Sequence, residues 1–235
     1  MLLHRRRIGL ASLTALLLML TMLALAATAT AQSPPGNSGA ARACQQGGYE
    51  AYSRADGTRF RNTGECVSYA ARGGSLVRLP DLTVTKGCSP TTIASGGSIT
   101  CTFVISNAAD AGPATVSTGM LLLRDAASLT SSNVRVGARV TAAPTLNYRC
   151  EAAITSSTTF EAFCRPTQPV TIPAGGTLTF AIEYTYTNFA ATPVTVTDVA
   201  TVTPDCATSG PPPGGIVERN CANNSSPPVV VTVNP

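Results

Sequence analysis

All eight cysteines of this chain lie beyond residue 43, and no two of them are spaced as C-x-x-C. An even number of cysteines in an exported chain predicts four disulfide bonds. Zinc binding is the alternative, and it is disfavoured because His4 is the single histidine of the sequence. The cysteines are Cys44, Cys66, Cys88, Cys101, Cys150, Cys164, Cys206 and Cys221.

The first 31 residues predict an export signal. Basic residues Arg5 to Arg7 precede an apolar run over residues 8–27, and Ala29-Thr30-Ala31 supplies the small residues that a signal peptidase reads. We expect cleavage before Gln32, with an uncleaved anchor as the alternative, because the run is about long enough to span a bilayer. No second stretch is as long and apolar, so the sequence predicts no membrane span after cleavage and a secreted or cell-surface protein.

The charge of the chain argues against nucleic acid as a partner. The formal net charge is +4, but Arg5 to Arg7 belong to the signal segment, so the remainder is close to neutral. Affinity for nucleic acid depends on clustered cationic contacts to phosphates. A local excess of arginine between Arg42 and Arg78 could contact an anionic wall polymer or lipid surface, although a solvated basic face is the simpler interpretation.

Beyond residue 80 the hydrophobic periodicity is that of β-strands. Side chains alternate between apolar and polar over residues 99–106 and again over residues 177–186. Each stretch follows a glycine pair, Gly96-Gly97 or Gly175-Gly176, and no lysine follows either pair as a phosphate-binding loop would require. We therefore interpret the repeated phrase as two turns that open strands of one sandwich, with tandem repeats as the alternative.

Further strands are expected wherever a similar pattern is bounded by turn residues. Their spacing is typical of a β-sandwich. Asp198 falls on the apolar phase of its strand, and we expect a bulge to turn it outward, because an inward carboxylate is costly unless it is hydrogen-bonded. The expected strands are Leu82–Lys86, Ala114–Leu123, Asn133–Thr141, Leu146–Cys150, Thr159–Cys164, Val194–Val202 and Val229–Val233.

The positions of the cysteines favour bonds between neighbours in sequence. Cys88 and Cys101 lie on either side of the first glycine pair, Cys150 and Cys164 flank a polar hairpin tip, and a proline-glycine stretch separates Cys206 from Cys221. Eight cysteines allow on the order of a hundred connectivities, so the pattern favours this pairing without fixing it.

The segment around Cys44-x-x-Gly47-Gly48-Tyr49 and Phe60-Arg61-Asn62-Thr63-Gly64-Glu65-Cys66-Val67-Ser68-Tyr69 resembles a short two-cysteine motif. That motif recurs in exported proteins of Gram-positive and related bacteria. The resemblance covers about 30 residues and implies a bacterial, exported origin and a Cys44–Cys66 bond, but no activity.

The chain from Pro80 onward resembles a bacterial surface repeat known as domain of unknown function eleven. The resemblance implies an immunoglobulin-like sandwich with a structural or adhesive role on secreted or wall-attached proteins. It covers nearly all of residues 80–233, although the six cysteines there and the absence of tandem copies depart from the family pattern. The residues that carry it are Asp81-Leu82-Thr83-Val84-Thr85-Lys86, Ser89-Pro90, Ala94-x-Gly96-Gly97-x-Ile99-Thr100, Asn107, the second glycine pair, Ala200-Thr201-Val202-Thr203-Pro204-Asp205 and Ala222-Asn223-Asn224-Ser225.

Few side chains remain that could carry catalysis. Without a histidine after the signal, Ser-His-Asp and Cys-His arrangements are excluded, and we expect no enzyme and no cofactor. If Cys150 faces Cys164 across a hairpin, Glu161 faces Ala153 and lies diagonal to Glu151, at a separation that suits an inverting glycosidase. Two solvated glutamates are the preferred interpretation. Calcium binding by these glutamates, or by Asp110 and Asp125, is a further alternative.

Lys86 is the single lysine of the chain. Some bacterial surface sandwiches join a strand lysine to an asparagine in an isopeptide bond. The alternative is an ordinary lysine at the end of a strand. Asparagines that could serve as the partner are Asn107, Asn188 and Asn234.

Taken together, the sequence predicts an all-β, immunoglobulin-like antiparallel β-sandwich over residues 80–235. A small disulfide-stapled module over residues 32–79 and the signal over residues 1–31 precede it. We expect a non-catalytic exported structural or adhesive module whose partner is an extracellular protein or a cell-wall polymer. The alternative is a carbohydrate- or wall-binding module that uses Tyr49, Tyr52 and Tyr69 with the nearby arginines.

Overall fold

The computed structural model describes residues 37–144, 147–203, 206 and 216–235. The predicted signal over residues 1–31, the strand start at Leu146 and the loop between Cys206 and Cys221 fall outside these residues, in whole or in large part. Residues 36–235 form one compact unit. Within the described residues, no helix has the length and apolar character to cross a membrane.

The segment before the sandwich folds around its own disulfide. Its elements are the helices α2 (Asn37–Ala43), η2 (Gly48–Ala51) and α3 (Thr63–Ala71) and a ribbon of β1 (Tyr52–Ser53) and β2 (Val77–Arg78). Asn62 caps α3 by accepting a hydrogen bond from the Glu65 backbone N–H, because the first turn of a helix leaves its N–H groups without partners. A small cluster of Cys44, Phe60, Cys66 and Ala70 forms the interior of this segment.

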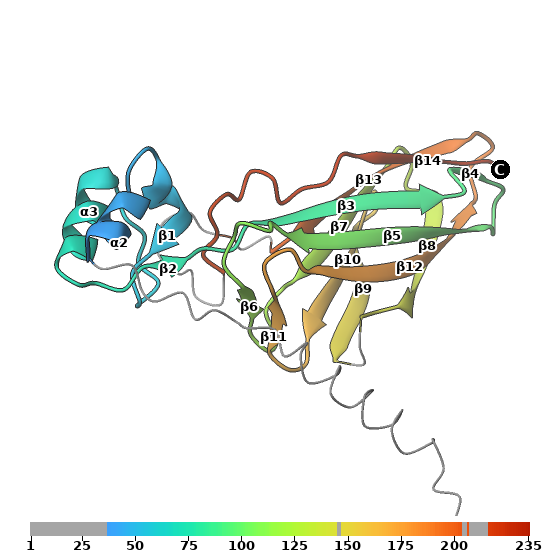
Figure 1. The fold of residues 1–235 in the computed structure, drawn as a ribbon. Coiled ribbons are helices and arrows are strands. Elements are labelled where there is room, and N and C mark those ends of the chain that lie inside the picture. The colour runs from blue at the N-terminus through green and yellow to red at the C-terminus, as the bar shows by residue number, and fades with distance from the viewer. Residues whose placement is uncertain (1–36, 145–146, 204–205, 207–215) are drawn as a thin grey trace, which may run out of the picture. The chain divides into compact units, whose positions relative to one another are not determined.

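The rest of the chain is a sandwich of antiparallel strands, as Figure 1 shows. One sheet has the order β3-β5-β12-β8, and the other has the order β4-β14-β13-β7-β10-β9, in which β4 and β14 alone run parallel. The strands of the first sheet are β3 (Leu82–Ser89), β5 (Ser98–Asn107), β12 (Thr177–Asn188) and β8 (Val134–Ala142). Those of the second are β4 (Thr92–Ile93), β14 (Val229–Val233), β13 (Val194–Val202), β7 (Leu123–Leu129), β10 (Thr159–Pro166) and β9 (Tyr148–Ser156).

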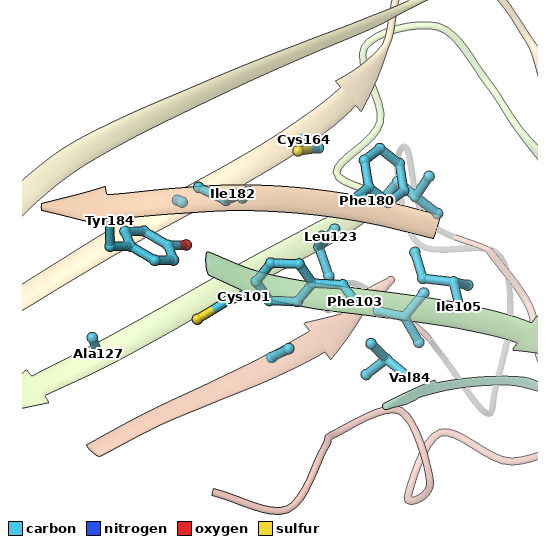
Figure 2. Packing of buried hydrophobic residues seen from close by; sticks show 14 of the residues in the cluster. Val84, Cys101, Phe103, Ile105, Leu123, Ala127, Cys164, Phe180, Ile182 and Tyr184 are labelled. Atoms are coloured by element: carbon cyan, nitrogen blue, oxygen red, sulfur yellow. The ribbon is translucent and has the colours of Figure 1, made fainter. Parts of the chain in front are cut away.

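The core lies between the two sheets, where alternate residues of strands such as β5, β10, β12 and β13 are buried. In β12, for example, Phe180, Ile182, Tyr184 and Tyr186 are all buried. Figure 2 shows side chains from β5 and β12 packed together with Leu123 and Ala127 of β7. The predicted all-β, immunoglobulin-like sandwich is therefore confirmed.

The two glycine pairs are turns that lead into adjacent strands of one sheet. Gly96 and Gly175 have φ angles of 81° and 70°, which favour glycine, and β5 and β12 begin shortly after them. These two strands pair with each other in antiparallel register. The repeated phrase thus marks neighbouring strands of one sandwich, as predicted.

Two predicted strands are wrong in extent, since the predicted Leu146–Cys150 ends well before β9 does at Ser156, and Ala114–Leu123 is not one strand. Residues 114–123 contain the short strand β6 (Ala114–Val116), which forms a two-stranded ribbon with β11 (Val170–Ile172), and they end at Leu123, the first residue of β7. Backbone hydrogen bonds from Met120 to Ser117 and from Leu122 to Cys164 turn the chain between them. The apolar run Met120 to Leu123 looks continuous in sequence, although it crosses from the ribbon to the six-stranded sheet.

Candidate functional site

The four disulfides in the structure join cysteines that are neighbours in sequence. They are Cys44–Cys66, Cys88–Cys101, Cys150–Cys164 and Cys206–Cys221. Cys88 and Cys101 are register partners on β3 and β5, and Cys150 and Cys164 are register partners on β9 and β10. Each of these two bonds therefore joins adjacent strands of the same sheet, one bond in each sheet. None of the eight cysteines has a free thiol.

The most distinctive polar cluster lies inside the sandwich. The Lys86 side chain has no exposed surface, and its Nζ is 2.6 Å from Asp125 Oδ1 and also ion-paired with Asp198. Both carboxylates are 2% exposed. Because Lys86 lies on β3, and Asp125 and Asp198 lie on β7 and β13, this cluster connects the two sheets across the core. We call Lys86, Asp125 and Asp198 the lysine–aspartate cluster.

Aromatic side chains enclose the lysine–aspartate cluster. The Tyr184 hydroxyl donates a 2.6 Å hydrogen bond to Asp125 Oδ2, and Lys86 Nζ is 5.1 Å from the centre of the Phe103 ring. Figure 2 shows Tyr184 and Phe103 beside Cys101 on the four-stranded sheet. The tyrosine fixes one carboxylate, and the ring stabilises the lysine cation while excluding water.

One lysine cannot neutralise two carboxylates, and the energetics of the cluster reflect this. Burial and the charge of Asp125 raise the pKa of Asp198, Lys86 opposes both effects, and the resulting pKa is about 7. In the described residues no hydrogen-bond donor reaches Asp198 Oδ1. Near neutral pH the cluster therefore tends to hold an extra proton on a carboxylate.

The expectation that a bulge turns Asp198 outward is wrong. Asp198 pairs in unbroken register with Val229 on one side and Ala127 on the other, and its side chain points into the core. The cost of an inward carboxylate is offset here by Lys86, which lies on the inward phase of β3 with Leu82 and Val84. Periodicity alone places both charges inside but does not show that they meet.

The asparagines that could serve as a partner of Lys86 make hydrogen bonds elsewhere. Asn107 donates to the carbonyls of Gly112, Ile172 and Pro173, and its Oδ1 accepts from the Asp81 N–H. Asn188 similarly donates to the carbonyls of Thr192 and Val233, while Asn234 donates from its backbone to Ile93. The side chains that contact Lys86 Nζ are aspartates, so the alternative of an asparagine partner is wrong.

The predicted hairpin register around Glu151 and Glu161 is confirmed, since Glu161 faces Ala153 and Phe163 faces Glu151. Each glutamate, however, has an arginine partner. Glu161 pairs with Arg124, and Glu151 Oε1 is 2.5 Å from Arg149 Nε. Both carboxylates are thus engaged with cations.

Asp110 and Asp125, the other candidate calcium ligands, lie in separate ion pairs. Asp110 Oδ2 is 2.8 Å from Arg219 Nη1 at the surface, whereas Asp125 is buried in the lysine–aspartate cluster. Within the described residues, the one group of potential metal-binding atoms is formed by Cys88, Cys101 and Asp198. Its two sulfurs are joined in a disulfide and so lack the thiolate charge that binds metals.

A further buried carboxylate, which the sequence did not predict, belongs to Glu218. Its side chain is fully buried, and it accepts hydrogen bonds from the Leu82 N–H at 2.8 Å, from Asn224 at 3.1 Å and from Thr203. Burial raises its pKa. These contacts tie the segment after residue 216 to the ends of β3 and β13. The stretch from 216 to 220 has no alternation that would signal burial.

The tyrosines and arginines of the first segment contribute largely to its own packing. The Arg54 guanidinium lies 5.4 Å from the Tyr69 ring and pairs with Glu65 at 2.5 Å. Tyr69 in turn packs on Phe60. Tyr49, Tyr52 and Tyr69 are all half-buried against the small cluster, and Tyr52 has its exposed register partner Arg78 at 5.8 Å from its ring.

The tip of the β9–β10 hairpin is the predicted polar tip between Cys150 and Cys164. Thr155 and Ser156 each share a 2.7 Å hydrogen bond with Thr159, and beside them Ile154 is 63% exposed. We call residues 154–159 the hairpin tip. It combines an accessible apolar side chain with hydroxyl groups that hold a fixed arrangement.

Comparisons with known proteins do not assign the chain to a family. No protein-family model and no curated protein matches it. Solved structures to which the chain is similar include a CARDB domain from Pyrococcus furiosus, at 15% identity over 67% of this chain and 90% of that one, with a TM-score of 0.31. A cohesin module of a Clostridium perfringens family 33 glycoside hydrolase matches at 9% identity over 66% and 97%, with a TM-score of 0.35.

A family 3b carbohydrate-binding module from a Clostridium thermocellum cellobiohydrolase also matches, at 17% identity over 49% of this chain and 91% of that one, with a TM-score of 0.33. Scores this low carry no inference about function. The function must be inferred from the chain's own residues.

Proposed function

We propose that the chain is a non-catalytic, extracytoplasmic structural or adhesive module of a bacterium, built to hold a binding surface rigidly. The observation that carries the proposal is the double bracing of the sandwich. Disulfides staple neighbouring strands within each sheet, and the lysine–aspartate cluster connects the sheets through the core. Four disulfides suit an oxidising compartment, and the motif at Cys44 to Tyr69 supports the bacterial, exported origin.

The hairpin tip is the surface that we expect to contact the partner. Its exposed Ile154 can enter a pocket on a partner, and its hydroxyls can supply hydrogen bonds around that contact. The Cys150–Cys164 bond lies in the same hairpin and limits the motion of the tip, so less conformational entropy is lost on binding. A surface held in this way suits an extracellular protein or a cell-wall polymer.

Binding of the oxidised chain from Gln32 onward to purified cell wall, glycans and extracellular proteins tests this proposal. We expect Ile154→Ser to weaken a saturable interaction about ten-fold or more. Val230→Ser removes a similarly exposed apolar side chain from β14 and serves as the matched control, with unchanged affinity. Equal affinities of the wild type and Ile154→Ser would contradict the assignment of the tip.

The second candidate is a carbohydrate- or wall-binding module, and the pair of Tyr52 and Arg78 favours it. These residues face each other on an accessible ribbon, where an aromatic ring could stack on a sugar and the guanidinium could contact an anionic group. In the same assay, loss of wall or glycan binding in Tyr52→Ser with full binding in Ile154→Ser would select this function instead.

A further inference from the structure

The lysine–aspartate cluster has the components of a covalent cross-link. An amine with no solvent exposure lies 2.6 Å from one carboxylate and in contact with a second, and all three groups come from different strands of opposing sheets. Groups held in this way react with a large effective concentration. Exclusion of water from the site also disfavours the reverse reaction, hydrolysis.

We propose that Lys86 and Asp198 form an intramolecular isopeptide bond, with Asp125 as the proton carrier. The bond would convert a cluster of buried charges into a neutral amide and one carboxylate. The Lys86–Asp198 ion pair is replaced by a neutral amide, and the Tyr184 hydroxyl remains as a hydrogen-bond donor to the Asp125 carboxylate. The proposal concerns a modification of the scaffold and does not depend on the identity of the binding partner.

The reaction is a condensation that releases one water molecule. The Lys86 ammonium gives a proton to the Asp198 carboxylate, which leaves a neutral amine and a neutral carboxylic acid. The amine nitrogen forms a bond to the carboxyl carbon, and Asp125 accepts a proton from that nitrogen. Asp125 then delivers the proton to the hydroxyl group on the same carbon, the C–O bond breaks, and water leaves. No oxidant, cofactor or net change of charge is required.

The contacts of the two aspartates distinguish their roles. Asp125 has both oxygens engaged, Oδ1 with Lys86 and Oδ2 with the Tyr184 hydroxyl, so it is fixed as a carboxylate that can accept and return a proton. Asp198 has an oxygen, Oδ1, that no donor in the described residues reaches. Burial also raises the pKa of Asp198, which favours the protonated acid that an amine can attack.

Intact mass spectrometry of the reduced, denatured chain tests the proposal directly. We expect the purified protein to be lighter than its sequence by the mass of one water molecule. Because Lys86 is the single lysine, a lysine-specific protease provides a second readout. The cross-linked chain resists cleavage after residue 86, whereas an unlinked chain is cut into two fragments. Full sequence mass together with complete cleavage at Lys86 would overturn the proposal.

Variants assign the roles of the individual groups. Asp198→Ala and Asp125→Asn should each restore the full mass and the cleavage at Lys86, while circular dichroism reports whether the sheets still form. Glu218→Gln changes a buried carboxyl group outside the cluster and is the matched control, in which the mass of one water should still be missing. Loss of water in Asp198→Ala would exclude Asp198 as the acceptor, and loss of water in Asp125→Asn would exclude Asp125 as the proton carrier.

Discussion

At the scale of single residues, Gly96 shows how one backbone angle determines the entry to β5. Its φ of 81° is unfavourable for any residue with a Cβ, although the space around a Cβ built there is empty. We expect Gly96→Ala to lower the free energy of unfolding by about 1–2 kcal/mol, measured by urea denaturation. Gly87→Ala is the matched control, because Gly87 also has open space but lacks a positive φ. Equal effects of the two changes would contradict this explanation.

Glu218 gives a prediction for the dependence of stability on pH. Burial raises its pKa above the ordinary value of 4.5, so the folded chain holds a proton that the unfolded chain has released. The contribution of Glu218 to stability is therefore full below about pH 4.5 and is lost as the pH rises through the folded pKa.

Urea unfolding of the wild type and Glu218→Gln over a series of pH values measures this contribution. As the pH rises above 4.5, the unfolding free energy of the wild type should fall relative to that of Glu218→Gln. The variant cannot titrate at this position, so the other carboxylates cancel in the comparison. A difference that stays constant with pH, or changes in the opposite direction, would contradict a raised pKa at Glu218.

The lysine–aspartate cluster could be predicted from the sequence only in part. Lys86 and Asp198 both fall on the apolar phase of their strands, which is visible in the sequence. Two opposite charges on inward phases could have suggested an ion pair. The packing of the two sheets decides which strands face each other across the core. The contacts of β3 with β7 and β13 could therefore not be predicted from the sequence.

At the scale of elements, we expect the β9–β10 hairpin to depend strongly on its disulfide. β9 is an edge strand and its outer half is exposed, so few side-chain contacts hold it to the sandwich. The Cys150–Cys164 bond closes a loop with a sequence separation of 14 residues.

Replacement of both Cys150 and Cys164 by alanine should lower the unfolding free energy by about 3 kcal/mol, in line with the entropy of loops of this size. Hydrogen exchange should show that β9 loses protection before β12, the central strand of the other sheet, does. Uniform loss of protection across both strands would contradict a local role for this bond.

The accuracy of the predicted strands follows their composition. Val194–Val202 and Val229–Val233 alternate clearly and match β13 and β14 in both bounds. Beyond its first residue, Leu123, β7 was missed because it contains aspartate and alanine, which have weak strand propensity. The ribbon strand β11 and the edge strand β4 were missed because two or three residues cannot show a period.

At the scale of the whole molecule, the described residues form two separate hydrophobic clusters. One lies between the sheets of the sandwich, and a much smaller one surrounds Cys44 and Cys66. A core this small contributes little stability by itself, so its disulfide has the larger share in holding that segment. The division of the chain at residue 80 remains a prediction. Arg59 of the first segment donates a 2.7 Å hydrogen bond to the Glu218 carbonyl of the second.

The central claim is that oxidised cysteines, paired with their neighbours in sequence, brace a sandwich that presents a binding surface. Peptide mapping of the purified chain without reduction tests it most directly. The account predicts four linked peptide pairs, Cys44–Cys66, Cys88–Cys101, Cys150–Cys164 and Cys206–Cys221, and no thiol that reacts with an alkylating reagent. Free thiols in the purified chain, or a bond that joins the two sheets such as one between Cys101 and Cys164, would contradict it.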